Sequence, residues 1–367
     1  MANNRIFYAC QAIALAPNPD NNNFKELHGV QSVGINTSFN LEQVFELGQI
    51  SIYENIEGLP DVELTIERVL DGYPLAYRLA TKRSDGTDPG KTLVERTKNR
   101  CCAALAIYPD DKDTVSGAPP VQVYMSGMYV NSVSYTLPVD GNCTESVTLV
   151  GNHKVWDQSV NKFTAALAFP KFTYSGSGDI PRANQAGFIA GGVQRRENVL
   201  MASSIVPKAL LESYGLSATG TATTGNNWDD ALKVPKIHIQ NITISTDLGR
   251  EDILELGQKA PYYRAPNFPV EVTAEFEVIS ISGDFVYAYE NGRPDYVGTV
   301  QEGTNTSEET ISIVMQDGTT FELGNKNRLS SVTYGGGDAG GGNASMTFSY
   351  VTYNDFSITG PFGNYGE

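Results

Sequence analysis

The sequence lacks an apolar run long enough to cross a bilayer, and no basic stretch leads into an apolar one at its N-terminus. It therefore predicts neither a membrane span nor a signal peptide. Cysteine is scarce: Cys101 and Cys102 are adjacent, whereas Cys10 and Cys143 stand alone. This spacing matches neither a disulfide framework nor a Cys-x-x-Cys metal pair. We expect the cysteines to be reduced and mostly buried.

Basic charge and histidine are also sparse. The chain has 26 Lys and Arg against 42 Asp and Glu, a net charge of −16. Such a surface repels phosphate, which excludes a protein that grips nucleic acid. The three histidines, His28, His153 and His238, are far apart and lack metal-ligand spacing, so we expect no metal and no cofactor.

The composition favours a folded β protein. Hydrophobic residues make up 40% of the chain and charged residues 19%, enough to build a core. The 36 Gly, 19 Tyr and 15 Phe favour strands and turns over helices. We predict an all-β fold with at most one or two short helices, and 367 residues make two domains the leading expectation.

An internal repeat supports two domains. Four blocks recur in the same order. They are Ile35–Gln49 with Ile244–Gln258 at an offset of 209, Pro60–Thr65 with Pro269–Thr273 at an offset smaller by one, Val130–Tyr135 with Leu329–Tyr334, and Gly141–Leu149 with Gly342–Tyr350. A weaker match joins residues 6–17 to residues 196–207. The pattern predicts a tandem duplication of two homologous β domains.

The predicted first domain spans residues 1–180, with its repeat at 29–150. A Gly-rich linker follows at 181–195, and the second domain spans 196–367, with its repeat at 237–351. Residues 62–67 and 270–277 alternate apolar and polar side chains, which predicts half-buried strands with a carboxylate-bearing face formed by Glu63, Glu67, Glu271 and Glu275. Residues 130–150 indicate a hairpin, and residues 89–100 a short helix.

Motifs of catalysis are missing. The sequence has no G-x-S-x-G elbow and no cysteine in a nucleophile context. Residues 335–340 satisfy G-x-G-x-x-G, but a strand-like segment follows them, so we predict a hairpin tip and not a phosphate loop. The acidic runs at 20–23 and 110–113 lack the pattern of a calcium loop and are expected to be solvated turns. The carboxylates on the two strands leave glycoside hydrolysis open, although a solvated face is favoured. We do not expect an enzyme.

Residues 45–60, 129–151 and 255–269 resemble virion structural proteins of tailed bacteriophages, and most of all tail tube proteins. That resemblance implies a β-sandwich or small barrel in each domain and stacked rings around a channel, with six domains per ring. Two domains per chain then give a pseudo-sixfold trimer, while a ring of six chains stays an alternative.

The predicted function is therefore a virion protein that assembles into the tail tube, whose acidic channel lets DNA pass without binding it. Its expected partners are copies of itself, with a sheath or tape-measure protein as further candidates and no membrane. Its expected location is the virion, after synthesis in the host cytoplasm. The loops at 175–192 and 335–343 are expected to contact the next ring.

Two alternatives remain. One is another virion role, as a neck, tail-terminator or capsid-decorating protein. The other is a carbohydrate-binding or adhesin-like sandwich that uses Trp228, Tyr262 and Tyr263 as stacking platforms.

Overall fold

The computed structural model describes residues 6, 8, 11–18, 24–48, 50–108, 121–157, 192–201, 203–207, 210, 238–279, 308–337 and 342–360. Within them the predicted all-β fold is confirmed. The helical elements of this part are α1 (Ala76–Ala80), α2 (Leu93–Arg96) and a 3₁₀ turn at Arg196–Asn198. All are far too short to span a membrane, and no helix in the described ranges is long and apolar enough to do so.

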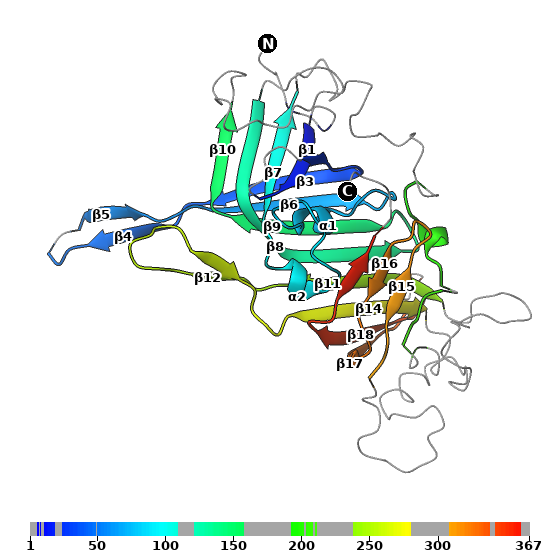
Figure 1. Cartoon of the computed structure of the whole chain (residues 1–367). Coiled ribbons are helices and arrows are strands. Elements are labelled where there is room, and N and C mark those ends of the chain that lie inside the picture. The colour runs from blue at the N-terminus through cyan, green and yellow to red at the C-terminus, as the bar shows by residue number, and fades with distance from the viewer. Residues whose placement is uncertain are drawn as a thin grey trace, which may run out of the picture.

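Eight antiparallel strands form one long sheet, which runs across the middle of Figure 1. Their spatial order is β3-β6-β9-β8-β11-β14-β18-β17. The bounds are β3 (Val30–Ser38), β6 (Asp61–Val69), β9 (Thr144–Gly151), β8 (Val121–Pro138), β11 (Ile239–Asp247), β14 (Glu271–Ile279), β18 (Ser345–Tyr353) and β17 (Arg328–Gly335). The predicted hairpin at 130–150 is confirmed as the β8–β9 pair.

Strand β8 belongs to two sheets. Its last ten residues pair with β9 and β11, whereas its first half pairs with β7 (Cys101–Ile107) and β10 (His153–Asp157). The second sheet continues through β1 (Gln11–Pro17) to β2 (Lys25–Glu26) and stands upright in Figure 1. Gly127, with φ of +67°, lies at the passage between the sheets, where a residue with positive φ lets the strand bend. Sequence alternation predicted only the later part of β8.

One face of the long sheet is covered. Helices α1 and α2 and a small sheet of β15 (Ser312–Val314), β16 (Thr320–Glu322) and β19 (Ser357–Thr359) lie in front of it in Figure 1. The rings of Tyr135 and Phe321 pack 4.7 Å apart between these layers. A single hydrophobic core contains side chains of both repeats, such as Leu64 and Phe276. The proposed boundary at 181–195 stays a prediction, because most of those residues lie outside the described part.

The strands of the two repeats have the same order. The first half of the sheet is β3-β6-β9-β8, and the second half is β11-β14-β18-β17. Both halves also share two β-bulges. One places an extra residue at Gln31 in β3 and at Gln240 in β11, and each of these side chains donates to the carbonyl two residues before it. The other bulge lies at Asn131 in β8 and at Ser330 in β17. Shared irregularities of this kind are typical of duplicated structures.

The structure corrects two details of the alignment. Leu64 pairs with Leu149, and Ala274 pairs with Tyr350 in the same ladder position, so β6 and β14 correspond at an offset of 210. The sequence comparison aligned these strands at an offset of 208, which differs from the structural offset by two residues. A shift of two residues along a strand leaves each side chain on the same face of the sheet. The weak match of residues 6–17 to 196–207 is wrong: β1 is a sheet strand, whereas the later segment forms a 3₁₀ turn and isolated bridges.

The predicted short helix at 89–100 is confirmed as α2. Thr92 caps it and forms a capping box with Glu95. Helix α1 was missed, because five residues are too few to show a helical period.

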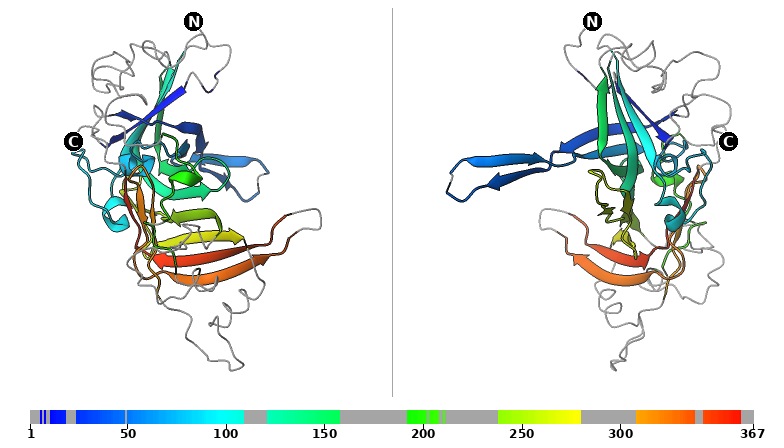
Figure 2. Two further views of the ribbon diagram at one scale, coloured as in Figure 1. Left: turned by 90° about the vertical axis from the view of Figure 1, so that its right-hand side faces the viewer. Right: turned by 60° about the vertical axis from the view of Figure 1, so that its left-hand side comes forward.

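Each repeat also carries an antiparallel hairpin arm that the sequence did not predict. The first arm consists of β4 (Leu41–Phe45) and β5 (Ile52–Glu57), and the second of β12 (Glu251–Ile253) and β13 (Tyr263–Ala265). Both project from the same end of the long sheet in Figure 1, and Figure 2 shows the first arm reaching well beyond the body. The Glu-Leu-Gly part of the shared string, Glu46–Gly48 and Glu255–Gly257, lies at the turn of each arm.

Candidate functional surface: the polar face and edges of the long sheet

The face of the long sheet opposite the core is polar. Because side chains alternate along a strand, every second residue of each strand points to this face. Serine, threonine and asparagine predominate there. They include Ser32, Asn36, Thr65, Ser132, Ser134, Thr136, Ser146, Thr148, Thr243, Ser245, Thr273, Thr347, Ser349, Ser331 and Thr333.

Carboxylates concentrate on two strands of this face, β6 and β14. They are Asp61, Glu63 and Glu67 on β6, and Glu271, Glu275 and Glu277 on β14. Glu67 accepts a hydrogen bond from the Ser32 hydroxyl at 2.8 Å. The predicted pattern of buried apolar residues alternating with exposed carboxylates is confirmed on both strands. The two strands correspond between the repeats, so each half of the sheet carries one acidic stripe.

Asp61 is the most constrained of these carboxylates. Burial acts to raise its pKa, but hydrogen bonds from Asn40 and Arg264 and the Arg264 charge outweigh that effect and hold the pKa below its usual range. Arg264 donates to Asp61 at 2.8 Å and also pairs with Asp252. Because Asp61 belongs to the first repeat and Arg264 to the second, this ion pair links the repeats.

The face offers no paired catalytic acids among the predicted candidates. Strands β6 and β14 are separated by β9, β8 and β11, which puts them about 19 Å apart at the usual strand spacing. Glu63 and Glu67 are four residues apart on one strand, or about 13 Å. Glycosidase carboxyl pairs lie roughly 5–9.5 Å apart. The structure therefore does not bring Glu63, Glu67, Glu271 and Glu275 together for that chemistry.

The histidines are separate in space. His28 stacks on Tyr73 with ring centroids 4.1 Å apart, His153 shares a hydrogen bond with Ser126, and His238 is exposed. Among the residues whose positions are described, no group of three potential ligands could hold a metal ion.

Three cysteines are free and buried, as predicted: Cys101, Cys102 and Cys143. Burial raises the pKa of the Cys143 thiol to about 12, which disfavours the reactive thiolate. Cys10 lies outside the described residues.

Other sequence candidates can be placed only in part. The strand expected after the glycine-rich segment is confirmed, since β17 ends at Gly335 and β18 begins at Ser345, and residues 338–341 between them lie outside the described part. The acidic runs at 20–23 and 110–113, the loop at 175–192 and Trp228 also lie outside it. Tyr262 is exposed, but Tyr263 packs edge-on against Tyr129 with ring centroids 5.9 Å apart.

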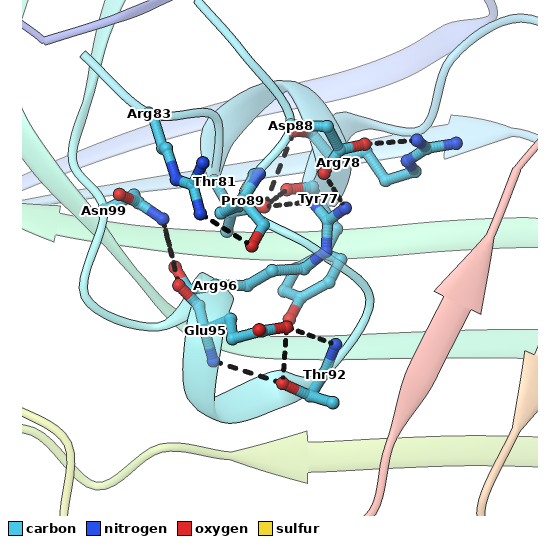
Figure 3. A network of polar contacts seen from close by, with 10 residues as sticks. All are labelled: Tyr77, Arg78, Thr81, Arg83, Asp88, Pro89, Thr92, Glu95, Arg96 and Asn99. Atoms are coloured by element: carbon cyan, nitrogen blue, oxygen red, sulfur yellow. Dashed lines mark hydrogen bonds and ion pairs between the residues drawn. The ribbon is translucent and has the colours of Figure 1, made fainter. Parts of the chain in front are cut away.

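A polar network fixes the two helices on the covered side (Figure 3). Asp88 pairs with both Arg78 and Arg96, and Arg96 donates to the Thr81 hydroxyl at 3.0 Å. Burial acts to raise the pKa of Asp88, and the two arginines more than offset it, so the pKa lies below the usual range. These groups face one another and hold the covering layer in place.

The two repeats meet at the β8–β11 pair, which we call the internal seam. Tyr135 lies opposite Ile244 there, and both are fully buried. The Leu248 amide donates to the Asn131 carbonyl at 2.8 Å, and Leu248 is 1% exposed.

Arg250 clasps the internal seam. Its guanidinium donates to the carbonyls of Val130, Arg264 and Thr97 at 2.6, 2.9 and 2.8 Å. It also lies 4.7 Å from the ring centroid of Tyr129, a cation–π distance. Sequence comparison missed Arg250 because the first repeat has Leu41 at this position.

Within the described part of the chain, β3 and β17 have no strand on their outer side and form the two edges of the long sheet. Each is the counterpart of a seam strand. Val33 and Ile35 of β3 are half-buried, whereas the matching Ile242 and Ile244 of β11 are buried. On β17, Tyr334 is 47% exposed, whereas its counterpart Tyr135 is fully buried.

The residue directly after β3 shows the same contrast in burial. Phe39 is 71% exposed, whereas its counterpart after β11, Leu248, is 1% exposed. Strand β3 contains no charged residue and no proline, the usual protection of an exposed edge. The edges thus have the side chains of a seam without the partner strand.

No protein-family model and no curated protein sequence matches this chain. Solved structures show distant likeness. The anti-feeding prophage tube-terminating cap aligns with 10% identity over 43% of this chain and 95% of its own, at a TM-score of 0.31. A chain of the anti-feeding prophage baseplate aligns with 11% identity over 44% of this chain and 99% of its own, at a TM-score of 0.32. A chain of the sheath–tube complex of an extracellular contractile injection system, PVC, aligns with 11% identity over 42% of this chain and 93% of its own, at a TM-score of 0.28.

Proposed function

We propose that this protein is a structural subunit that closes into a ring by pairing β17 of one copy with β3 of the next, as expected for a tail tube protein. One observation carries the proposal: β17 and β3 correspond to β8 and β11, which already form such a pair inside the chain. Repeating that contact between copies covers both open edges. It leaves each strand of the long sheet with two neighbours.

The register between copies follows from the internal seam. There Ser245 lies opposite Ser134 and Thr246 opposite Val133. Their counterparts are Asn36 and Thr37 on β3 and Thr333 and Val332 on β17. We therefore expect Asn36 of one copy to face Thr333 of the next, with Thr37 facing Val332.

Three copies would supply 24 strands, three times the eight of the long sheet. This number agrees with the six domains per ring that the resemblance to tail tube proteins implies. A closed barrel of that many strands, spaced about 4.8 Å and tilted by about 40°, measures about 48 Å across its backbone. Such a channel is wider than a DNA duplex.

The polar face suits the wall of this channel. The opposite face is covered by the chain's own helices and small sheet, so the polar face is the one left free to line a lumen. Apart from Arg328 at its edge, this face consists mainly of hydroxyl and carboxylate side chains, which give phosphate no cation to bind. A wall of this kind lets DNA slide past, and the protein acts by shape and charge without catalysis.

A cysteine pair tests the ring directly. In the Asn36→Cys/Thr333→Cys variant, antiparallel partners lie about 4.5–5.5 Å apart at Cα, within the reach of a disulfide. Oxidation is expected to link copies into covalent oligomers that stop at a closed trimer on a denaturing gel. A ladder that stops at six copies would instead indicate a ring of six chains.

Two matched controls accompany this test. The Ser134→Cys/Ser245→Cys pair occupies the same positions at the internal seam and is expected to link within one chain. The Asn36→Cys/Ser331→Cys pair is out of register by two residues and is expected to link poorly. If the internal pair links and the Asn36/Thr333 pair leaves only monomers, the proposed ring is wrong.

Electron microscopy of the purified protein separates the roles in a virion. Hollow filaments of stacked rings are expected for a tube protein, whereas single rings would favour a neck or terminator protein. Separate monomers at high concentration, together with binding on a glycan array, would support the adhesin alternative.

The charge of the wall has its own test. Glu63→Lys/Glu275→Lys places lysines on both acidic stripes, and assembled rings of this variant are expected to retain DNA in a salt-dependent manner. The control Glu197→Lys/Glu322→Lys makes the same charge change on the covered side of the chain. Equal DNA retention by the two variants would show that the polar face does not line the channel.

A further inference from the structure

The two kinds of seam in the proposed ring differ in chemistry, and the difference identifies a contact between copies. This inference rests on the ring proposed above. At the internal seam, Tyr129 of β8 packs against Tyr263 of the second arm, with Arg250 over the Tyr129 ring. The counterparts of these residues can be derived from the strand ladders.

Tyr129 corresponds to Arg328. In β8, Tyr129 lies opposite Val150 of β9, directly before the bulge residue Asn131 and its neighbour Val130. In β17, Arg328 lies opposite Val351 of β18, in the same place relative to the Ser330 bulge. The two hairpins therefore place Tyr129 and Arg328 at the same point of the repeat.

Tyr263 corresponds to Glu54. In the second arm, Ile253 pairs with Tyr263. In the first arm, Val44 pairs with Glu54, and Val44 precedes the shared Glu-Leu-Gly-Gln string by the same number of residues as Ile253 does. Glu54 thus occupies the position on the first arm that Tyr263 holds on the second.

We propose that an ion pair between Arg328 of one copy and Glu54 of the next joins the copies where an aromatic contact joins the repeats. The two side chains have opposite charge, and both are exposed in the single chain. Within the described residues, Arg328 makes a 3.7 Å contact to Glu308, and both side chains are about half exposed. Its guanidinium is therefore available to a second carboxylate.

The surroundings fit this assignment. Arg250 has no counterpart at the seam between copies, since Leu41 takes its place, so Arg328 supplies the cation from the opposite strand. Phe39 takes the place of the buried Leu248 and would be covered by the neighbouring β17. The pair also adds specificity, because a chain paired in the wrong order would bring Glu54 against Tyr129 instead of Arg328.

Charge reversal tests the pair. Each of Arg328→Glu and Glu54→Arg is expected to raise the protein concentration for half-assembly about tenfold, because like charges then meet at every seam. The double variant is expected to assemble within about threefold of the wild type. Sedimentation velocity over a dilution series measures all three. Both positions are exposed, so folding should be unaffected, and circular dichroism checks it.

Glu308→Ala is the matched control. It removes the existing partner of Arg328 and is expected to leave assembly unchanged. If Glu308→Ala impairs assembly as much as Arg328→Glu does, or if the double reversal fails to restore it, the assignment of Glu54 is wrong.

The outcomes also separate this inference from the ring itself. Normal assembly of both single reversals, together with linkage of the Asn36/Thr333 cysteine pair, would overturn the ion pair and leave the ring intact. Loss of that cysteine linkage in an otherwise wild-type chain would overturn the ring, and with it the ion pair.

Discussion

Replacing Glu145 with methionine gives the sharpest test of the packing in the first repeat. Glu145 is fully buried and lies opposite Tyr135, at the place where the second repeat has Met346 opposite Tyr334. It accepts hydrogen bonds from the Tyr135 hydroxyl at 2.8 Å and from the first two backbone N–H groups of α1 at 2.8 and 3.1 Å. The Arg68 guanidinium lies 3.8 Å away and is also fully buried.

Methionine removes the acceptor of the Tyr135 hydroxyl and of the two α1 amides. It also removes one of the two carboxylates beside Arg68, which keeps its 2.6 Å ion pair with Asp71. Each buried donor left without an acceptor costs about 1–3 kcal/mol, so we expect Glu145→Met to reduce the free energy of unfolding by about 4 kcal/mol. An unfolding entropy of about 2.1 cal/mol/K per residue over 367 residues converts this to a melting temperature lower by about 5 °C.

A second substitution isolates the charge. Val278 of the second repeat corresponds to Arg68, so Arg68→Val/Glu145→Met rebuilds the apolar pair of that repeat. The double variant no longer contains a buried arginine that has lost one of its two carboxylates, and we expect its cost to be about 2 kcal/mol less than the sum of the single costs. Asp71 loses its ion pair in both proteins that carry Arg68→Val, so that loss cancels in the comparison. Urea unfolding of the four proteins measures this coupling. Additive costs, or a Glu145→Met cost below about 1 kcal/mol, would refute the reasoning.

Three further predictions concern single groups. Asp88→Asn is expected to lower the melting temperature at pH 7, and the deficit should close below pH 3.8, because a lowered carboxyl pKa stabilises the fold only while the group is ionised. Asp317 is the opposite case: burial raises its pKa, so its ionisation costs stability as the pH rises above 3.8, and Asp317→Asn should melt at or above the wild-type temperature at pH 7 and no higher at pH 3. Arg250→Leu, which copies Leu41, should lower the free energy of urea unfolding by about 3 kcal/mol through the loss of three charged hydrogen bonds, with Arg250→Lys losing less. Flat pH profiles for either carboxyl variant, or equal losses for both Arg250 variants, would contradict these assignments.

The internal repeat has a structural consequence for assembly. The internal seam between the repeats is built from Arg250, Leu248 and two tyrosines. In the proposed ring, the seam between copies would use different residues at the same positions. The two repeats of one chain would then allow the covalent seam and the assembly seam to be tuned separately, which a ring of identical single modules does not allow.

Local patterns in the sequence determined a large part of this structure. Alternation of apolar and charged residues determined β6, β14 and the direction of their carboxylates, because a strand with one buried face requires a period of two. Recurrence of the same blocks predicted that the two halves share one arrangement of strands, and the strand ladders supplied the order itself. The buried cysteines and the β8–β9 hairpin also followed from local chemistry.

Tertiary structure alone decided how those pieces meet. The joining of β8 to β11, the double role of β8 in two sheets and the burial of Arg68 against Glu145 depend on contacts between residues distant in the chain, which no local period encodes. The strand ladders also decided that β6 and β14 are equivalent at an offset of 210. The sequence could not decide this, because a shift of two residues keeps every side chain on the same face and leaves the alternating pattern unchanged.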